Sequence, residues 1–271
     1  MAQDSEVDPA ALLELARAAA GEAARLVVER RPADLGVADT KSSPTDVVTE
    51  MDTAAEKLIK QMILDSRPHD GFLGEEGGSA QGTSAVRWVI DPIDGTVNYL
   101  YDLPAWSVSI GVEVDGVTVA GVVAAPRYSE EYTALLGSGS WCNGQRLRVR
   151  PAVGLEGALV ATGFGYRAER RARQGQIVAA LLPRLRDIRR AGSAALDMCA
   201  VAAGRLDGYF ERGTHAWDWS AAALIAQEAG ARVGGLAESP AGEPMVLAAP
   251  PGTFEALHDV LVELGAGADD Y

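Results

Sequence analysis

The sequence predicts an α+β fold in its first half and a mixed α/β fold in its second half. Three observations support this prediction: two helical stretches near the N-terminus, alternating strands joined by Asp-Gly and Asn-Gly turns, and a later alternation of strands with helices. The chain has 271 residues, 48% of them hydrophobic, which suffices for one large domain or two closely packed subdomains. We place the subdomain boundary near residue 150, giving units 1–150 and 151–271.

Two amphipathic helices are predicted first. Apolar residues recur at helical spacing over 9–31, with Asp8 as the N-cap and Pro9 just inside the helix. A polar stretch, 41–52, then leads into a second helix that carries apolar residues such as Ile59 and Ile63 inward, with its cap at Thr49 or Asp52.

Strands follow. Alternation of apolar and polar residues over 106–114, an Asp115-Gly116 turn and the apolar stretch 117–123 predict an antiparallel hairpin. The same half contains a short extended piece at 71–77, a buried strand at 86–90, a strand at 131–136 and a turn at Asn143-Gly144. These features indicate an antiparallel sheet flanked by the two helices.

The second half alternates strands and helices, which predicts a mixed α/β subdomain. Strands are expected at 158–161, 187–189, 208–211 and 245–249, and helices at 174–185, 194–203, 217–229 and 254–264. The basic stretch 167–173 lies just before the first of these helices. It fits either a solvent-exposed helix start or a binding site for a second phosphate, and Glu169 within it favours the exposed helix start.

The most informative stretch is Trp88-Val-Ile-Asp-Pro-Ile-Asp-Gly-Thr-Val-Asn98. A buried strand delivers Asp91 and Asp94 into a turn, and Pro92 keeps Asp91 extended so that the two carboxylates can converge. Two such charges about 4 Å apart repel by roughly 4 kcal/mol at an effective dielectric near 20, so the pair needs a cation, and an oxygen-loving one such as Mg²⁺ is expected. A plain turn with local Asx hydrogen bonds is the alternative.

This stretch resembles the signature of the inositol monophosphatase family of Mg²⁺-dependent phosphatases. Three further segments resemble that family in the same order: Lys41-Ser-Ser-Pro-Thr-Asp46-Val-Val-Thr49, Gly74-Glu75-Glu76 and Trp217-Asp218. The resemblance implies a layered αβαβα sandwich, lithium sensitivity and frequent homodimers. By themselves, the three segments fit a loop ending in a helix cap, a solvated acid pair and a helix cap.

The resemblance also implies residue roles. The metal ligands would be Glu75, Asp91, the carbonyl of Ile93, Asp94 and Asp218, holding two or three Mg²⁺, with Mn²⁺ as an alternative. Thr96 would orient the attacking water, assisted by Asp46 and Thr49 through a further bound water, with Glu75 in the same catalytic set; Lys41 is a weaker candidate. Substrate contacts would come from Asp94, Gly95, Thr96, Ala194, Glu211 and Asp218.

The bulk properties narrow the function. A formal charge of −14 argues against nucleic-acid binding. The sequence shows no apolar run of membrane-spanning length and no signal-peptide layout, so we expect a cytoplasmic protein with no membrane partner. Cys142 and Cys199 are too few for a disulfide framework.

We therefore expect a phosphoric monoester hydrolase that acts on a small phosphorylated polyol, inositol 1-phosphate first. Histidinol phosphate, fructose 1,6-bisphosphate and adenosine 3′,5′-bisphosphate are alternative substrates, although the neutral Val97 and the short connection 77–85 favour a monophosphate. A non-catalytic, metal-binding regulatory module is the alternative from another class.

Overall fold

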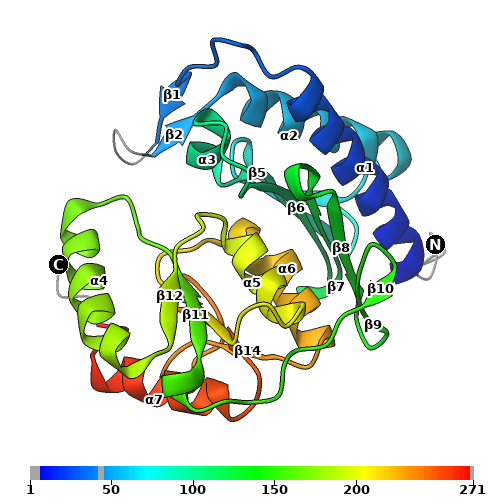
Figure 1. Ribbon diagram of the computed structural model, residues 1–271. Helices are drawn as coiled ribbons and strands as arrows, with labels where there is room; N and C mark the ends of the chain where they lie inside the picture. Colours follow the sequence, from blue (N-terminus) through cyan, green and yellow to red (C-terminus); the bar gives the residue numbers. More distant parts are fainter. Residues whose placement is uncertain (1–6, 42–45, 269–271) are drawn as a thin grey trace.

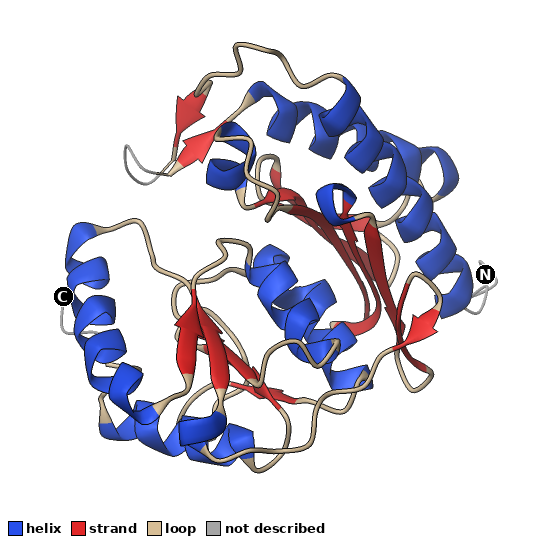
Figure 2. Cartoon of the chain, in the orientation of Figure 1, coloured by secondary structure: helices blue, strands red, loops and turns tan. Residues whose placement is uncertain are grey.

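The computed structural model describes residues 7–41 and 46–268, and its elements stack in five layers (Figure 1, Figure 2). Helices α1 (Pro9–Glu29) and α2 (Glu50–Ser66) cover one face of a large sheet. Helices α5 (Ala194–Ala202) and α6 (Ala216–Glu228) lie between this sheet and a smaller one. Helices α4 (Ala168–Leu181) and α7 (Thr253–Glu263) cover the far side. The predicted layered α and β fold is confirmed.

The large sheet has eight strands in the order β10-β9-β8-β7-β6-β5-β3-β4. Their bounds are β3 Gly71–Gly74, β4 Gly78–Ala80, β5 Val86–Asp94, β6 Ser107–Val114, β7 Val117–Ala125, β8 Glu130–Leu135, β9 Gly139–Cys142 and β10 Gln145–Arg146. The sheet is antiparallel as predicted except where β3 and β5 run parallel. That exception arises because β4 occupies the edge of the sheet beside β3. The chain then crosses back through 81–85, and β5 pairs with the opposite side of β3.

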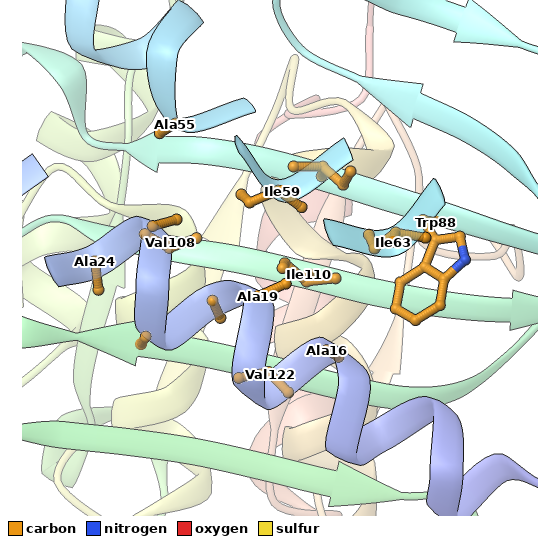
Figure 3. Packing of buried hydrophobic residues seen from close by; sticks show 14 of the residues in the cluster. Ala16, Ala19, Ala24, Ala55, Ile59, Ile63, Trp88, Val108, Ile110 and Val122 are labelled. Atoms are coloured by element: carbon orange, nitrogen blue, oxygen red, sulfur yellow. The ribbon is translucent and has the colours of Figure 1, made fainter. Parts of the chain in front are cut away.

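The main core lies between this sheet and the two N-terminal helices. Figure 3 shows Ile59 and Ile63 of α2 over Ile110 and Trp88 of the sheet, all fully buried. The indole N–H of Trp88 donates to the buried Asp70 carboxylate at 2.9 Å, so its one polar atom is satisfied. Each large apolar side chain buried in this way contributes about 1.5–3 kcal/mol.

The smaller sheet has the order β12-β11-β13-β15-β14 and contains both parallel and antiparallel strand pairs. Its strands are β11 Leu159–Thr162, β12 Asp187–Arg189, β13 Gly208–Glu211, β14 Arg232–Gly234 and β15 Val246–Ala249. Strands β11, β12 and β13 are parallel neighbours. Their carboxyl ends therefore meet at one edge of the sheet, where ligand sites of α/β proteins usually lie.

Several local predictions were wrong. Strand β5 does not stop at Ile90 but continues to Asp94, because a register shift accommodates Pro92, which has no N–H for the ladder. Helix α4 begins at Ala168, so part of the basic stretch is helical, and Pro183 limits its end.

The short elements escaped prediction because they depend on tertiary contacts. These are β1 Asp39–Thr40, β2 Val47–Val48, α3 Thr96–Leu100, β4, β14 and the 3₁₀ turns η1 Pro126–Tyr128, η2 Leu155–Gly157 and η3 Leu182–Arg184. No helix within the described ranges is long and apolar enough to cross a membrane.

Candidate active site

The two acids of the central stretch lie at an irregular end of β5. Asp91 pairs with Ser109 and Asp94 with Ser107 of β6, so two residues of β5 bulge out between the pairs. The Ile93 N–H donates to Asp91 Oδ1 at 3.0 Å, which folds the bulge back onto the first carboxylate. Both carboxylates are buried. Local hydrogen bonding of the Asx kind therefore occurs here, but it does not account for Asp94.

Asp94 instead links strand β5 of the large sheet to helix α5. Its carboxylate accepts hydrogen bonds from the Ser193 hydroxyl and from the N–H groups of Ala194 at 3.3 Å and Ala195 at 2.8 Å. These donors form the first turn of α5, where free N–H groups and the positive end of the helix dipole favour an anion. The predicted site residues Asp94 and Ala194 are thus in direct contact.

Glu75 follows β3, and its carboxylate forms an ion pair with Lys41. Lys41 Nζ lies 2.7 Å from Glu75 Oε1 and 2.6 Å from Glu76 Oε1. Behind this turn, the buried Glu56 carboxylate accepts from the Glu76 N–H at 2.8 Å. A Cβ at Gly74 would stand 2.6 Å from that carboxylate, so only glycine lets the turn approach it. The Gly-Glu-Glu spacing is therefore required by packing as well as by chemistry.

Asp218 lies in the first turn of α6, where it accepts from the His215 N–H at 2.6 Å. This is the helix cap expected from the sequence, and the carboxylate also faces the other acids. Their charges, with burial as the larger cause, raise the pKa of Asp218 well above its usual range. Among these charges, those of Glu75 and Asp94 have the largest effect. Capping and membership of the acid cluster are therefore compatible.

The pKa values of the other three acids are also raised. Burial, and then the charge of Glu75, raise the pKa of Asp91 well above its usual range, and a hydrogen bond links these two side chains. Burial also raises the pKa of Glu75 against the opposing effect of Lys41. For Asp94, burial outweighs the three donors from α5 and raises the pKa to about 6. Asp91 and Asp94 are buried, whereas Glu75 and Asp218 are half-buried. A divalent cation would relieve the resistance of these four acids to ionising together.

Thr96, which we expect to orient the attacking water, contacts Asp52 and the end of β5. Thr96 Oγ1 lies 3.0 Å from Asp52 Oδ1 and 3.0 Å from the Ile93 carbonyl. The Thr49 hydroxyl also donates to the Asp52 carboxylate, so Thr49 reaches Thr96 only through Asp52. Burial raises the pKa of Asp52 to about 6, against the hydrogen bonds from Thr49 and Thr96.

From the sequence, Asp52 is considered only as a helix cap, and its contact with Thr96 makes it a further candidate site residue. The signal was present: Asp52 stands three residues after Thr49, the spacing of a capping box, and the structure forms that box with the other carboxylate oxygen free for Thr96. Asp46 lies in the turn between β1 and β2, where its carbonyl accepts from the Lys41 N–H at 2.9 Å. Residues 42–45 of this segment lie outside the described residues.

Glu211 ends β13, and its carboxylate accepts from the Tyr209 hydroxyl at 3.1 Å. Burial raises its pKa to about 7. A Cβ at Gly163, which follows the parallel neighbour β11, would stand only 2.1 Å from the Glu211 oxygens. Gly95, with φ of 97°, starts α3 in a conformation that suits glycine, and a Cβ there would stand 2.9 Å from the Ala105 carbonyl.

The donor chemistry of this cluster fits a hard divalent cation. Glu75, Asp91, Asp94, Asp218 and the Ile93 carbonyl offer only oxygen, which suits Mg²⁺ and not a soft metal. Across 7–41 and 46–268, no three carboxylate, His or Cys side chains already surround one point as ligands. The carboxylates are turned instead toward protein donors, namely Lys41, Ser193 and the backbone N–H groups described above.

Together, a five-layer α and β fold and buried acids at the junction of its sheets define a protein of the phosphoric monoester hydrolase class. The sequence profile of the inositol monophosphatase family matches residues 8–264, and the chain belongs to this family.

Individual relatives agree with that membership. Inositol-1-monophosphatase SuhB of Mycobacterium tuberculosis is 46% identical over 265 residues, covering 90% of this chain and 91% of the relative. Nus factor SuhB of Escherichia coli K12 is 42% identical over 221 residues, covering 81% and 83%. The solved structure of Mycobacterium tuberculosis SuhB superposes with a TM-score of 0.82 at 42% identity, covering 97% of this chain and 100% of that one.

Proposed function

We propose that this protein hydrolyses a small phosphate monoester, inositol 1-phosphate first, with Mg²⁺ as the cofactor. The observation that carries the proposal is the meeting of Glu75, Asp91, Asp94 and Asp218 from distant segments beside Thr96, with Glu211 at the neighbouring strand end. A relative of 46% identity bears the name inositol-1-monophosphatase, which supports the choice of substrate.

The carboxylates and the Ile93 carbonyl would hold the cations. When bound, divalent ions would supply neutralisation of phosphoryl charge and a lowered pKa of water, with no need for a Cys, His or Ser nucleophile. Two sites, or three, are compatible with this number of acids. Lys41 would then leave Glu75 for Glu76, its second partner 2.6 Å away.

The chain's own groups would orient the attacking water. The Thr96 hydroxyl is fixed by Asp52 on one side and the Ile93 carbonyl on the other, each at 3.0 Å. The one hydrogen of this hydroxyl is directed toward these two acceptors, so a lone pair is left to accept from a water aimed at phosphorus. Asp52 is buried, and its pKa near 6 suits a group that accepts a proton at neutral pH. In this assignment Asp52 takes the role expected of Asp46 and Thr49.

The alcohol portion of the substrate would meet the second half of the chain. The loops that follow β11, β12 and β13 all begin at one edge of the small sheet, and Glu211 stands there with its carboxylate half-buried. Glu211, Asp218 and the N–H of Ala194 would read the hydroxyls. The N–H groups at Gly95 and Thr96 would hold phosphate oxygens, because a backbone turn of this kind concentrates donors on an anion.

The test is phosphate release from a panel of substrates with Mg²⁺ and with EDTA. Inositol 1-phosphate, histidinol phosphate and fructose 1,6-bisphosphate are compared by kcat/KM. We expect Mg²⁺-dependent release, highest for inositol 1-phosphate. Release that persists in EDTA would contradict the metal assignment, and a higher kcat/KM for another member of the panel would replace the substrate.

A regulatory role is the second candidate, because a relative of 42% identity is named a Nus factor. The two functions are compatible on one chain. They are separated by testing whether partner binding survives in a variant that lacks Asp91, because a surface used for a partner has no need of the buried acids.

A further inference from the structure

Glu211 ends β13, and its side chain is on the face of the small sheet that packs against α5. Residues two apart on a strand point to the same face, so Glu211 follows the direction of Tyr209. Tyr209 is fully buried and belongs to the core cluster that contains Ala194 and Ala195 of α5. The first turn of α5 also donates to Asp94. The Glu211 carboxylate therefore lies on the side of the small sheet that meets the acid cluster.

Two contacts hold this carboxylate in place. The Tyr209 hydroxyl donates to Glu211 Oε2 at 3.1 Å, and among the residues that the structure describes no second group donates to Glu211. The second contact is with the backbone of Gly163, where an added Cβ would stand 2.1 Å from both carboxylate oxygens. A glutamate side chain that is free to rotate loses conformational entropy when a ligand fixes it. Here the side chain is fixed by the protein before a ligand binds.

The Tyr209 ring is itself held by the core. Its partners in the sheet are Ala161 of β11 and Ala248 of β15, and these small side chains leave room for the ring. All three side chains are fully buried in one cluster. Burial also raises the pKa of Tyr209 well above its usual range, so the hydroxyl keeps its proton and remains a donor. A closely packed phenol therefore presents its O–H group at a fixed point below Glu211.

We propose that Tyr209 is a positioning residue, whose hydroxyl holds the Glu211 carboxylate in the orientation that contacts the hydroxyls of the substrate alcohol. Tyr209 is fully buried, so it acts through Glu211 and does not touch the substrate. A carboxylate that is oriented in advance spends no binding energy on its own ordering. A substrate with hydroxyl groups gains from this arrangement, whereas a substrate without them does not. This inference rests on the proposed function of the same site.

The experiment measures KM and kcat with Mg²⁺ for the full chain as wild type, Tyr209→Phe, Glu211→Ala and the double variant. Inositol 1-phosphate is compared with cyclohexyl phosphate, which has a six-membered carbon ring but no hydroxyl groups on it. The matched control is Tyr132→Phe. Tyr132 is also a buried phenol that donates to a glutamate two residues away on a strand, Glu130 of β8, at 2.5 Å. Thermal midpoints check the folding of each variant.

We expect Tyr209→Phe to raise KM for inositol 1-phosphate by about three- to tenfold, with kcat within about twofold of wild type, because the hydrogen bond that orients Glu211 is lost. In the Glu211→Ala background, the same substitution should change this KM by less than about twofold, because no carboxylate is left to orient. For cyclohexyl phosphate, Tyr209→Phe should change kcat/KM by less than about twofold. Tyr132→Phe should match wild type with both substrates.

The role of Tyr209 would be overturned by an unchanged KM, by an equal loss for the two substrates, or by an effect of the same size in the Glu211→Ala background. A Tyr209→Phe chain that does not fold would assign the hydroxyl to the stability of the core and overturn the role as well. In all these cases the wild type remains a phosphatase. Absence of Mg²⁺-dependent release by the wild type from both substrates would instead overturn the proposed function, so the two failures are distinguishable.

Discussion

Asp197 provides a test of the electrostatics of the site. It lies on α5, one turn after Ala194, and is 5% exposed. Burial is the largest cause of its raised pKa, about 8, followed by the negative charges of Glu211 and Asp94, with Arg190 opposing. The folded protein therefore keeps a proton on Asp197 at neutral pH. Asp197→Asn replaces this carboxylic acid by a neutral group of the same shape.

The size of the effect follows from the difference in pKa. An unfolded Asp titrates near 3.9, so the folded chain binds this proton about four pKa units more tightly. Because the folded pKa is raised, the free energy of unfolding is highest below about pH 4 and falls as the pH rises to about 8. At 1.36 kcal/mol per unit, the cost is about 1–2 kcal/mol at pH 5 and about 5 kcal/mol at pH 8, a difference of at most about 4 kcal/mol.

The assay is thermal unfolding at pH 5 and pH 8 in EDTA. For a chain of this size, 1 kcal/mol moves the midpoint by about 2–4 °C, so Asp197→Asn should gain up to about 8–16 °C more at pH 8 than at pH 5. The control is Asp259→Asn, whose side chain is 81% exposed. A gain of the same size at both pH values, or a loss at pH 8, would refute the account of Asp197.

The remaining predictions concern turnover. Thr96→Ala and Asp52→Asn should each lower kcat by about 10²–10⁴-fold, with KM within about threefold of wild type, because both residues act on the attacking water and neither contacts the alcohol. A normal kcat for Asp52→Asn would mean that another acid orients the water with Thr96. Glu211→Gln should mainly raise KM for inositol 1-phosphate, and an unchanged KM would remove Glu211 from recognition. Gly163→Ala should also raise KM for inositol 1-phosphate, because its Cβ would stand 2.1 Å from the Glu211 carboxylate. An unchanged KM in steady-state kinetics would mean that the loop after β11 shifts to make room for the added methyl group.

The layered architecture could be predicted because its signals are local. Helical periodicity defines α1 to within two residues at its end, and the Asp115-Gly116 turn defines the hairpin of β6 and β7. The parallel pairing of β3 with β5 could not be predicted, because it depends on which side of β3 the chain enters after β4. Nothing in the local pattern of 81–85 encodes that choice.

The site was predictable to the extent that it follows a motif. The acids at 75, 91, 94 and 218 stand in short strings whose residue types already suggest a cation site. Asp52 does not, since it depends on a contact formed in three dimensions, with Thr96. A helix cap looks ordinary in a sequence, and only the packing of α2 against β5 gives Asp52 this partner.

The central claim is that buried acids from distant segments act together through divalent ions. Its most direct test is Mg²⁺-dependent phosphate release from inositol 1-phosphate by wild type and by Asp91→Asn, with Asp259→Asn as the exposed control. We predict release by wild type and control that stops in EDTA, and a loss of more than about 10²-fold in kcat for a fully folded Asp91→Asn. Normal Mg²⁺-dependent turnover by that variant would contradict the account.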